Sequence, residues 1–161
     1  MRIDIWSDIV CPFCYVGKRN LEQALAEFEH RDEVEVVWHS FELDPSATEH
    51  PAGSLPEMIA GKYQMSLEQA IASQESLAER AREVGLDFNW RQARYGNTFD
   101  AHRVIHYAAE QGLASAAQEA FKLAYFTQGR SVQDHESILD IASEIGLDTA
   151  EVEAVLKSDR Y

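Results

Sequence analysis

The chain has few of the features that mark secreted or membrane proteins. Only two cysteines occur among its 161 residues, and a domain of this length can bury a hydrophobic core without disulfide cross-links. The first ten residues, "MRIDIWSDIV", lack the apolar segment and the cleavage site of a signal peptide. No run approaches the roughly 18 apolar residues that a membrane-spanning helix needs. We therefore expect one domain over residues 1–161, working in the cytoplasm without a membrane partner.

Basic residues are also scarce. Lysine and arginine number 14 against 28 aspartates and glutamates, which gives a formal net charge of −14. An acidic surface of this kind repels phosphate backbones, so we expect no nucleic-acid partner. The cytoplasm keeps thiols reduced, and a cysteine pair in that compartment is more typical of catalysis or metal binding than of a structural disulfide.

The first 43 residues change their hydrophobic period twice. In "RIDIW", residues 2–6, apolar and charged residues alternate as in a strand, and Trp6 is expected to lie in the core. The next stretch has a helical period, with Val16, Leu21 and Leu25 among the residues of its apolar side. Residues 34–43, "VEVVWHSFEL", return to β-branched and aromatic side chains. Residues 1–43 therefore predict a βαβ unit with two parallel strands.

Most of the remaining chain has a helical pattern. Residues 44–57 hold three of the four prolines and predict a loop. Ser66 and Gln69 have the spacing of a capping box at the start of a helix. Further helices are expected over residues 98–111, 115–128, 134–145 and 149–157. Three helices end in a Gly-Leu pair, in which a left-handed glycine precedes an apolar residue that packs back on the last turn.

The two cysteines lie in "DIVCPFCYVGK", residues 8–18, where the first strand ends and the first helix begins. Helix N-termini lower the pKa of a cysteine, so Cys11 is expected to be a thiolate at neutral pH. Cys14 follows one turn later on the same face, within disulfide reach and deeper in the fold. Pro12 suits the first helical turn.

Other roles for the pair remain open. Structural zinc takes four ligands and the chain has no second cysteine pair, although two copies could share a metal. Covalent haem attachment requires histidine directly after the second cysteine, and Tyr15 stands there. The cysteines could also be two small core residues. The position at the strand-to-helix junction, with Pro12 between the cysteines, favours a redox couple, and we expect no bound metal.

The segments "SDIVCPFCYVGKRNLEQAL", "VVWHSFELDP" and "YGNTFDAHRVIHYAAEQG" resemble the DsbA-like branch of the thioredoxin-like superfamily, and most closely its FrnE-type cytoplasmic subgroup. The branch is related to 2-hydroxychromene-2-carboxylate isomerase and kappa-class glutathione transferase. The resemblance implies an α/β thioredoxin-like fold: a βαβ half over residues 1–43, a large helical insertion over residues 53–128, and helices over residues 129–161 that lead back to the sheet.

The resemblance also implies a chemistry. Cys11 would attack a disulfide and Cys14 would resolve the mixed disulfide, with Pro12 and Phe13 as the dipeptide between them. Protein or small-molecule disulfides would be the substrates, no cofactor would be tightly bound, and glutathione could serve as co-substrate. The oligomeric state stays open, and a dimer is compatible with the sequence.

One departure from the family concerns the end of the chain. Relatives place a cis-proline opposite the cysteine pair and complete the sheet with a hairpin. Here the last proline is Pro56, expected in the loop, and the sequence stops at Tyr161 after a helix. We therefore expect a domain truncated at its C-terminus, with the remaining strands missing and the substrate groove incomplete.

A second group of candidate residues lies in "NTFDAHR". The resemblance places Asn97, Phe99 and His102 near the cysteine pair as substrate contacts, although a simple helix start capped by Thr98 would also explain this stretch. His102 and His106 have the i, i+4 spacing of a metal pair. Arg103 stands where a zinc protease would have glutamate, so no metal is expected there.

Two other functions compete with disulfide exchange. Glutathione-dependent isomerases and transferases of the kappa type share the insertion, but they generally carry serine in place of the first cysteine. A non-catalytic module that binds partners in an apolar groove is the third alternative. The intact pair of Cys11 and Cys14 favours the oxidoreductase.

Overall fold

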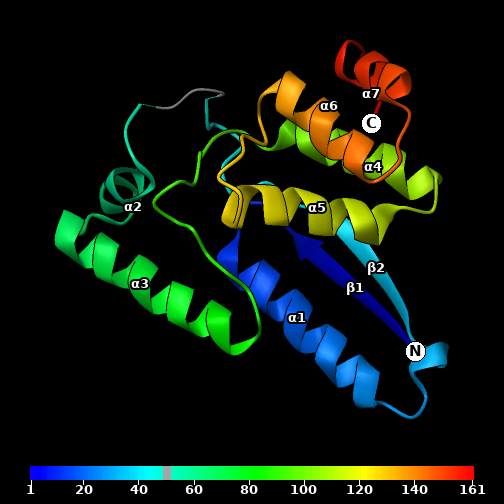
Figure 1. The fold of residues 1–161 in the computed structure, drawn as a ribbon, viewed down its shortest axis with the longest axis horizontal. Coiled ribbons are helices and arrows are strands. Elements are labelled where there is room, and N and C mark those ends of the chain that lie inside the picture. The colour runs from blue at the N-terminus through cyan, green and yellow to red at the C-terminus, as the bar shows by residue number, and fades with distance from the viewer. Residues whose placement is uncertain (49–51) are drawn as a thin grey trace.

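The computed structural model describes residues 1–48 and 52–161, and its first part is the predicted βαβ unit. Strand β1 (Arg2–Ser7) pairs in parallel with β2 (Glu35–Ser40), and Ile5 lies opposite Trp38. Helix α1 (Pro12–Glu27) and a 3₁₀ turn (Arg31–Glu33) connect the strands. The parallel pair is confirmed, and it brings the C-terminal ends of both strands to the same edge of the sheet, where α1 begins (Figure 1).

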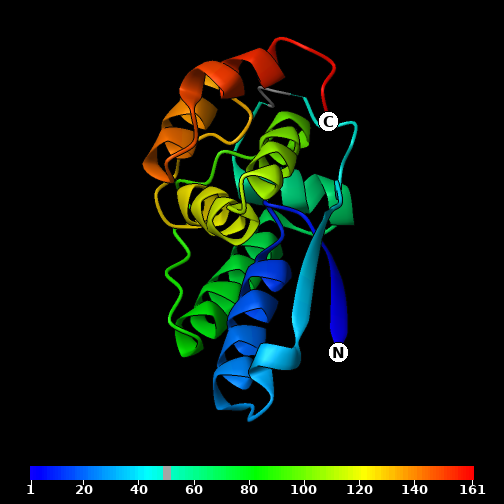
Figure 2. The same ribbon diagram turned by 90° about the vertical axis from the view of Figure 1, so that its right-hand side faces the viewer.

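The other helices form two groups beside this unit. Helices α2 (Leu55–Tyr63) and α3 (Leu67–Glu83) pack against each other, and α3 also contacts α1. The second group is a bundle in which neighbouring helices pack in sequence (Figures 1 and 2). Its members are α4 (Phe99–Glu110), α5 (Ala114–Phe126), α6 (His135–Glu144) and α7 (Thr149–Leu156). Among the described residues, no helix is long and apolar enough to cross a bilayer.

Helix α5 lies at the centre of the molecule, between α1 and the rest of the bundle (Figure 1). Phe121 and Tyr125 are fully buried, and the ring of Phe126 packs against Phe88 and Tyr15. Two polar side chains of the same helix, Gln118 and Lys122, are fully buried as well. The core is therefore built around a helix that carries polar groups into it.

The predicted helix ends are confirmed. Gly85, Gly112 and Gly146 have φ values of 77°, 73° and 83°, which favour glycine, and the amide of each following leucine bonds back to the preceding turn. Ser66 and Gln69 form the predicted capping box. The loop of residues 44–57, which lies in part outside the described residues, is shorter than expected. Pro56 belongs to the first turn of α2, because Ser54 and Glu57 form a second capping box ahead of it.

One prediction about burial is wrong. Trp6 is 62% exposed and stacks on His39, with ring centres 4.6 Å apart, because its side of β1 faces away from the helices.

The predicted apolar side of α1 does turn toward the protein: Val16 packs against the hydrophobic core, and Leu21 and Leu25 are half-buried. Tyr15 and Lys18 are the most deeply buried residues of α1, since α1 meets α5 through them.

Candidate active site

The cysteine pair occupies the junction predicted for it. Cys11 is the N-cap of α1, with extended backbone angles (φ −88°, ψ 111°), and Pro12 takes the first helical position. The backbone amide of Cys14 points back at the Cys11 sulfur, with 3.4 Å between nitrogen and Sγ. Both thiols are free and half-buried. A capping sulfur at a helix N-terminus is stabilised as an anion by the unpaired amides and by the helix dipole.

The two thiols titrate as one unit, and one thiol proton is shared between them. The pKa of Cys14 is lowered to about 5, first because the Cys11 thiol donates to it and then through hydrogen bonds from the Asp8 amide and the Ser7 hydroxyl; burial acts against this shift. The same sulfur-to-sulfur hydrogen bond raises the pKa of Cys11. The sequence predicted a thiolate on Cys11 alone. The structure instead gives both sulfurs donors, so the pair as a whole carries one negative charge.

Removing Cys14 isolates the contribution of the helix to Cys11. In Cys14→Ser, we expect Cys11 to titrate below the free-thiol value of about 8.5, because the residue 14 amide and Lys122 still favour its thiolate. Thiolate absorbance in the far ultraviolet against pH measures this directly. A single transition at or above about 8.5 would contradict it.

Lys122, on α5, is a neighbour of the pair that the sequence analysis did not single out. Its ammonium donates to the Ser7 hydroxyl at 3.0 Å and to the Asp8 carbonyl at 2.7 Å, and its side chain is fully buried. Burial lowers the pKa of Lys122 to about 8, while Cys14, Asp8 and Cys11 act to raise it. The sequence contained a signal for it. On a 3.6-residue period, Lys122 falls beside Phe121 and Tyr125 on the apolar side of the helix.

Asp8 is the buried acid of the site. Its carboxylate accepts hydrogen bonds from the amides of Ile9 and Leu43, both at 2.7 Å, and lies 3.2 Å from Nε2 of His102. Burial acts to raise the pKa of Asp8, but His102 and the Leu43 amide outweigh it, so the pKa is lowered. Asp8 therefore ties together the turn after β1, the segment after β2 and helix α4, three residues before Cys11.

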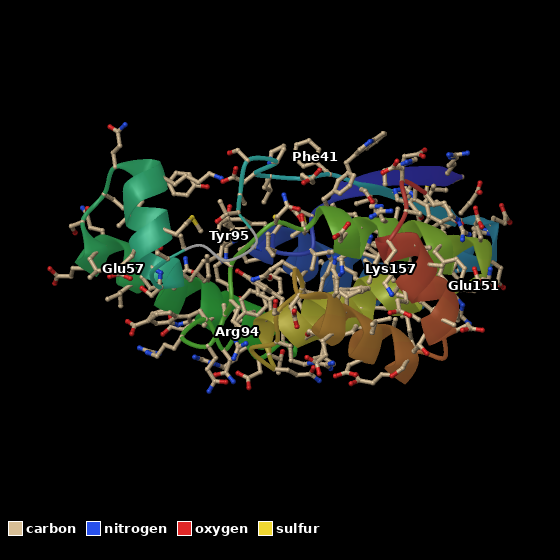
Figure 3. All side chains as sticks on the ribbon, turned by 90° about the horizontal axis from the view of Figure 1, so that it is seen from above. Phe41, Glu57, Arg94, Tyr95, Glu151 and Lys157 are labelled. Atoms are coloured by element: carbon tan, nitrogen blue, oxygen red, sulfur yellow. The ribbon has the colours of Figure 1, made fainter. Side chains whose placement is uncertain are left out.

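The three predicted substrate contacts take different roles. Thr98 is the N-cap residue of α4, as the helix-start interpretation expected, but its side chain makes no capping hydrogen bond. The Asn97 side chain instead accepts a hydrogen bond from the Phe99 amide at 2.8 Å. Phe99 is 51% exposed, whereas His102 is buried against Asp8. Phe99 and His102 line one cavity of about 140 Å³ together with His106, between the end of β2 and α4. Phe41, also in its lining, projects at the outer side of the molecule (Figure 3).

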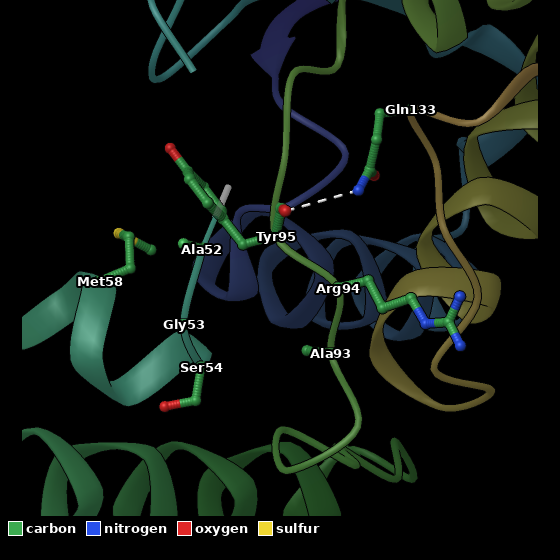
Figure 4. Close-up of a pocket in the computed structure, with 8 residues that line it drawn as sticks. All are labelled: Ala52, Gly53, Ser54, Met58, Ala93, Arg94, Tyr95 and Gln133. Atoms are coloured by element: carbon green, nitrogen blue, oxygen red, sulfur yellow. Dashed lines mark hydrogen bonds between the residues drawn. The ribbon is translucent and has the colours of Figure 1, made fainter. Parts of the chain in front are cut away.

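A second cavity, of about 240 Å³, lies between the start of α2 and the segment that leads to α4 (Figure 4). Tyr95 forms one wall, and its backbone carbonyl accepts from the Gln133 amide at 3.5 Å. Its hydroxyl donates to Asp44 at 2.9 Å. Neither cavity is lined by Cys11 or Cys14. Within the described ranges, no three histidine, cysteine or acidic side chains gather as a metal site would require.

A parallel βαβ unit with a Cys-Pro-Phe-Cys segment at the start of its helix defines the thioredoxin-like class of proteins. Within that class, the chain belongs to the family of DSBA-like thioredoxin domains, which matches it over residues 2–161. The predicted fold class, a thioredoxin-like α/β fold with a helical insertion, is confirmed.

Solved structures agree with this assignment. A protein described as a probable DsbA oxidoreductase from Streptomyces coelicolor is 46% identical and superposes with a TM-score of 0.93, over 98% of this chain and 68% of that one. A 2-hydroxychromene-2-carboxylate isomerase gives a TM-score of 0.70 at 17% identity, over 99% of this chain and 72% of the other. The cytosolic disulfide reductase DsbM from Pseudomonas aeruginosa gives a TM-score of 0.62 at 18% identity, over 96% of this chain and 69% of the other. The last two likenesses concern the fold alone.

Proposed function

We propose that the protein catalyses thiol–disulfide exchange through Cys11 and Cys14, as a reductase or isomerase of disulfides. The observation that carries this proposal is the capping geometry: the Cys14 amide faces the Cys11 sulfur at 3.4 Å, with both sulfurs on one helical turn. Such a position favours a thiolate at neutral pH, and the thiolate is the form that attacks disulfides.

The exchange runs in two steps, each with one bond formed and one broken. The Cys11 thiolate attacks one sulfur of the substrate disulfide, and the other sulfur leaves as a thiolate that takes up a proton. Cys14 then attacks the Cys11 sulfur of this mixed disulfide, which releases the second substrate thiol and closes the Cys11–Cys14 disulfide. The second step needs Cys14 as a thiolate, and its contacts with Ser7 and the Asp8 amide support that form.

The finer assignments are part of the same proposal. We assign the chain to the FrnE-type subgroup, place it in the cytoplasm and give it protein or small-molecule disulfides as substrates, with Asn97, Phe99 and His102 as substrate contacts. Glutathione would act as a co-substrate that reduces the disulfide. DsbM, which shares the fold and is named a cytosolic disulfide reductase, has a structure with GSH, and this supports the choice. We also divide the chain into a βαβ half over residues 1–43, a helical insertion over residues 53–128 and helices over residues 129–161 that lead back to the sheet. A dimer is one of the oligomeric states open to the protein.

Trapping a mixed disulfide tests the proposal. Cys14→Ser should accumulate a covalent adduct with a disulfide-linked peptide, because the resolving thiol is missing, while Cys11→Ser should form none. Mass spectrometry of both variants against the wild type identifies the adduct and the sulfur that carries it. An adduct on Cys14 in Cys11→Ser, with none on Cys11 in Cys14→Ser, would reverse the roles. Undiminished disulfide reduction by a variant lacking both cysteines would refute the proposal.

A further inference from the structure

Lys122 is a buried cation with an unusual set of neighbours. Its side chain is fully buried, and it donates to the hydroxyl of Ser7 and to the carbonyl of Asp8 in the segment that leads β1 into the cysteine pair. Both acceptors are neutral. Among the described ion pairs Lys122 forms none, whereas Lys18, the other buried lysine, is paired with Glu22 and with Glu119, the latter at 2.6 Å.

The charges that face Lys122 come from three elements. Asp8 approaches from the turn after β1, with both carboxylate oxygens already bonded to the Ile9 and Leu43 amides and its Oδ1 beside His102 of α4. Helix α1 contributes Cys11, Cys14 and the like-charged Lys18. On α5 itself, Glu119 is engaged by Lys18 and Arg19. A buried ammonium is costly without an opposite charge, and the cysteine pair is the group here whose charge depends on redox state.

We infer that Lys122 is the counter-charge of the reduced cysteine pair: its ammonium stabilises the single negative charge of Cys11 and Cys14 and loses that partner when their disulfide forms. The inference rests on the proposed function and names a further residue that sets its equilibrium. Lys122 acts by charge on the sulfurs and is not itself a nucleophile.

The redox step then includes a proton on the lysine. Two glutathione thiols give up two electrons and two protons and form their own disulfide, while the Cys11–Cys14 bond breaks. One proton binds the sulfur pair, which keeps one negative charge, and the other binds the Lys122 amine. Charge and protons balance, because the new thiolate and the new ammonium appear together.

Two substitutions separate charge from packing. Lys122→Met removes both the charge and the hydrogen-bond donor, and Lys122→Gln removes the charge but keeps a donor for Ser7 and Asp8. Loss of the charge destabilises the reduced form, so both variants should hold the disulfide about tenfold more strongly in glutathione buffers, a shift of about −30 mV for this two-electron couple. The lower thiol pKa should rise by about one unit in both.

Gln118→Met is the matched control. Gln118 is fully buried on the same helix, four residues before Lys122, and its amide has no hydrogen-bond partner among the described residues. This neutral change alters core packing near the site without altering charge, so it should leave the thiol pKa and the potential unchanged. If Lys122→Gln behaves like the wild type while Lys122→Met does not, Lys122 only positions the segment, and the inference is wrong.

A measurement on the unmodified protein covers the case in which the variants do not fold. Proton uptake on reduction is followed just below pH 8, and thiolate absorbance in the same sample gives the protons held by the sulfurs. If the inference holds, the protein takes up more protons on reduction than its two sulfurs hold, because Lys122 binds the remainder. An uptake equal to the protons on the sulfurs would overturn it. Absence of any reversible Cys11–Cys14 disulfide would instead remove the proposed function, and the two failures are thereby distinguishable.

Discussion

Glu119→Ala should lower the free energy of unfolding at neutral pH by roughly 2–3 kcal/mol, because Glu119 joins α5 to α1. Its carboxylate accepts from the Tyr15 hydroxyl and from Lys18, both at 2.6 Å, and is held by Arg19 as well. The Lys18 side chain is only 3% exposed, and without Glu119 its buried ammonium would be paired with Glu22 alone. The expected loss lies below that for a fully buried pair, since Glu119 itself is 30% exposed.

The same carboxylate predicts a pH dependence with a defined sign. Burial acts to raise the pKa of Glu119, but hydrogen bonds from Arg19, Lys18 and Tyr15 lower it from 4.5 to about 2. A pKa lowered by folding gives stability that is present above 4.5 and is lost as the pH falls from there toward 2. Urea unfolding at neutral pH and at pH values within this window should show the loss in the wild type and little of it in Glu119→Gln.

Glu144→Ala serves as the control for both experiments. Glu144 pairs with Arg130 at 2.8 Å on the surface, and an exposed pair of this kind contributes about 1 kcal/mol or less. If Glu119→Ala cost no more than Glu144→Ala, the link between α1 and α5 would not be a main support of the cysteine-bearing helix.

The redox potential should lie between about −270 mV, the thioredoxin value, and about −120 mV, the DsbA value, and nearer to the former. The potential rises as the reduced form is stabilised. The helix N-terminus and Lys122 stabilise the thiolate, whereas Phe13 contributes neither a donor nor a charge and the nearby Asp8 carboxylate opposes negative charge. In the cytoplasm, the location proposed above, the glutathione pool lies at about −220 mV or lower, and much of the protein would then be reduced.

Phe13→His tests the part of this expectation that depends on the intervening dipeptide. Phe13 is 60% exposed, so a histidine fits there, and its partial positive charge beside the thiolate should raise the potential by about 30 mV, or tenfold in the equilibrium constant. Phe13→Leu, which stays neutral, should leave the potential unchanged. Equilibration in glutathione buffers with counting of free thiols measures all three proteins. A wild-type value near −120 mV, or no effect of histidine, would contradict the account.

Much of the fold could be predicted because its signals are local. Three kinds of signal depend only on neighbouring residues, and each is confirmed. They are the alternation in "RIDIW", the capping box of Ser66 and the three helix ends at Gly-Leu pairs. The capping position of Cys11 could be predicted for the same reason: a strand, a cysteine and a proline in succession determine where the helix begins.

Features that depend on distant parts of the chain could not be predicted. Trp6 lies on an alternating strand, and the sequence does not say which side of the sheet the helices cover. The sharing of a proton between Cys11 and Cys14 depends on where Ser7 and the Asp8 amide lie in space. Lys122 bonds to Ser7 and to the Asp8 carbonyl, in the segment that leads into the pair, from more than 100 residues away along the chain. Helix periodicity places it on a buried side, but only the folded structure brings it to the cysteines.

Oxidation of the wild-type protein in glutathione buffers of graded potential, followed by peptide mass spectrometry, tests the central claim most directly. We predict one reversible two-electron transition in which the peptide containing Cys11 and Cys14 loses the mass of two hydrogens, with an internal disulfide and no stable glutathione adduct. If both thiols stayed free across the range, or were modified only by glutathione without joining each other, Cys11 and Cys14 would not be a redox couple.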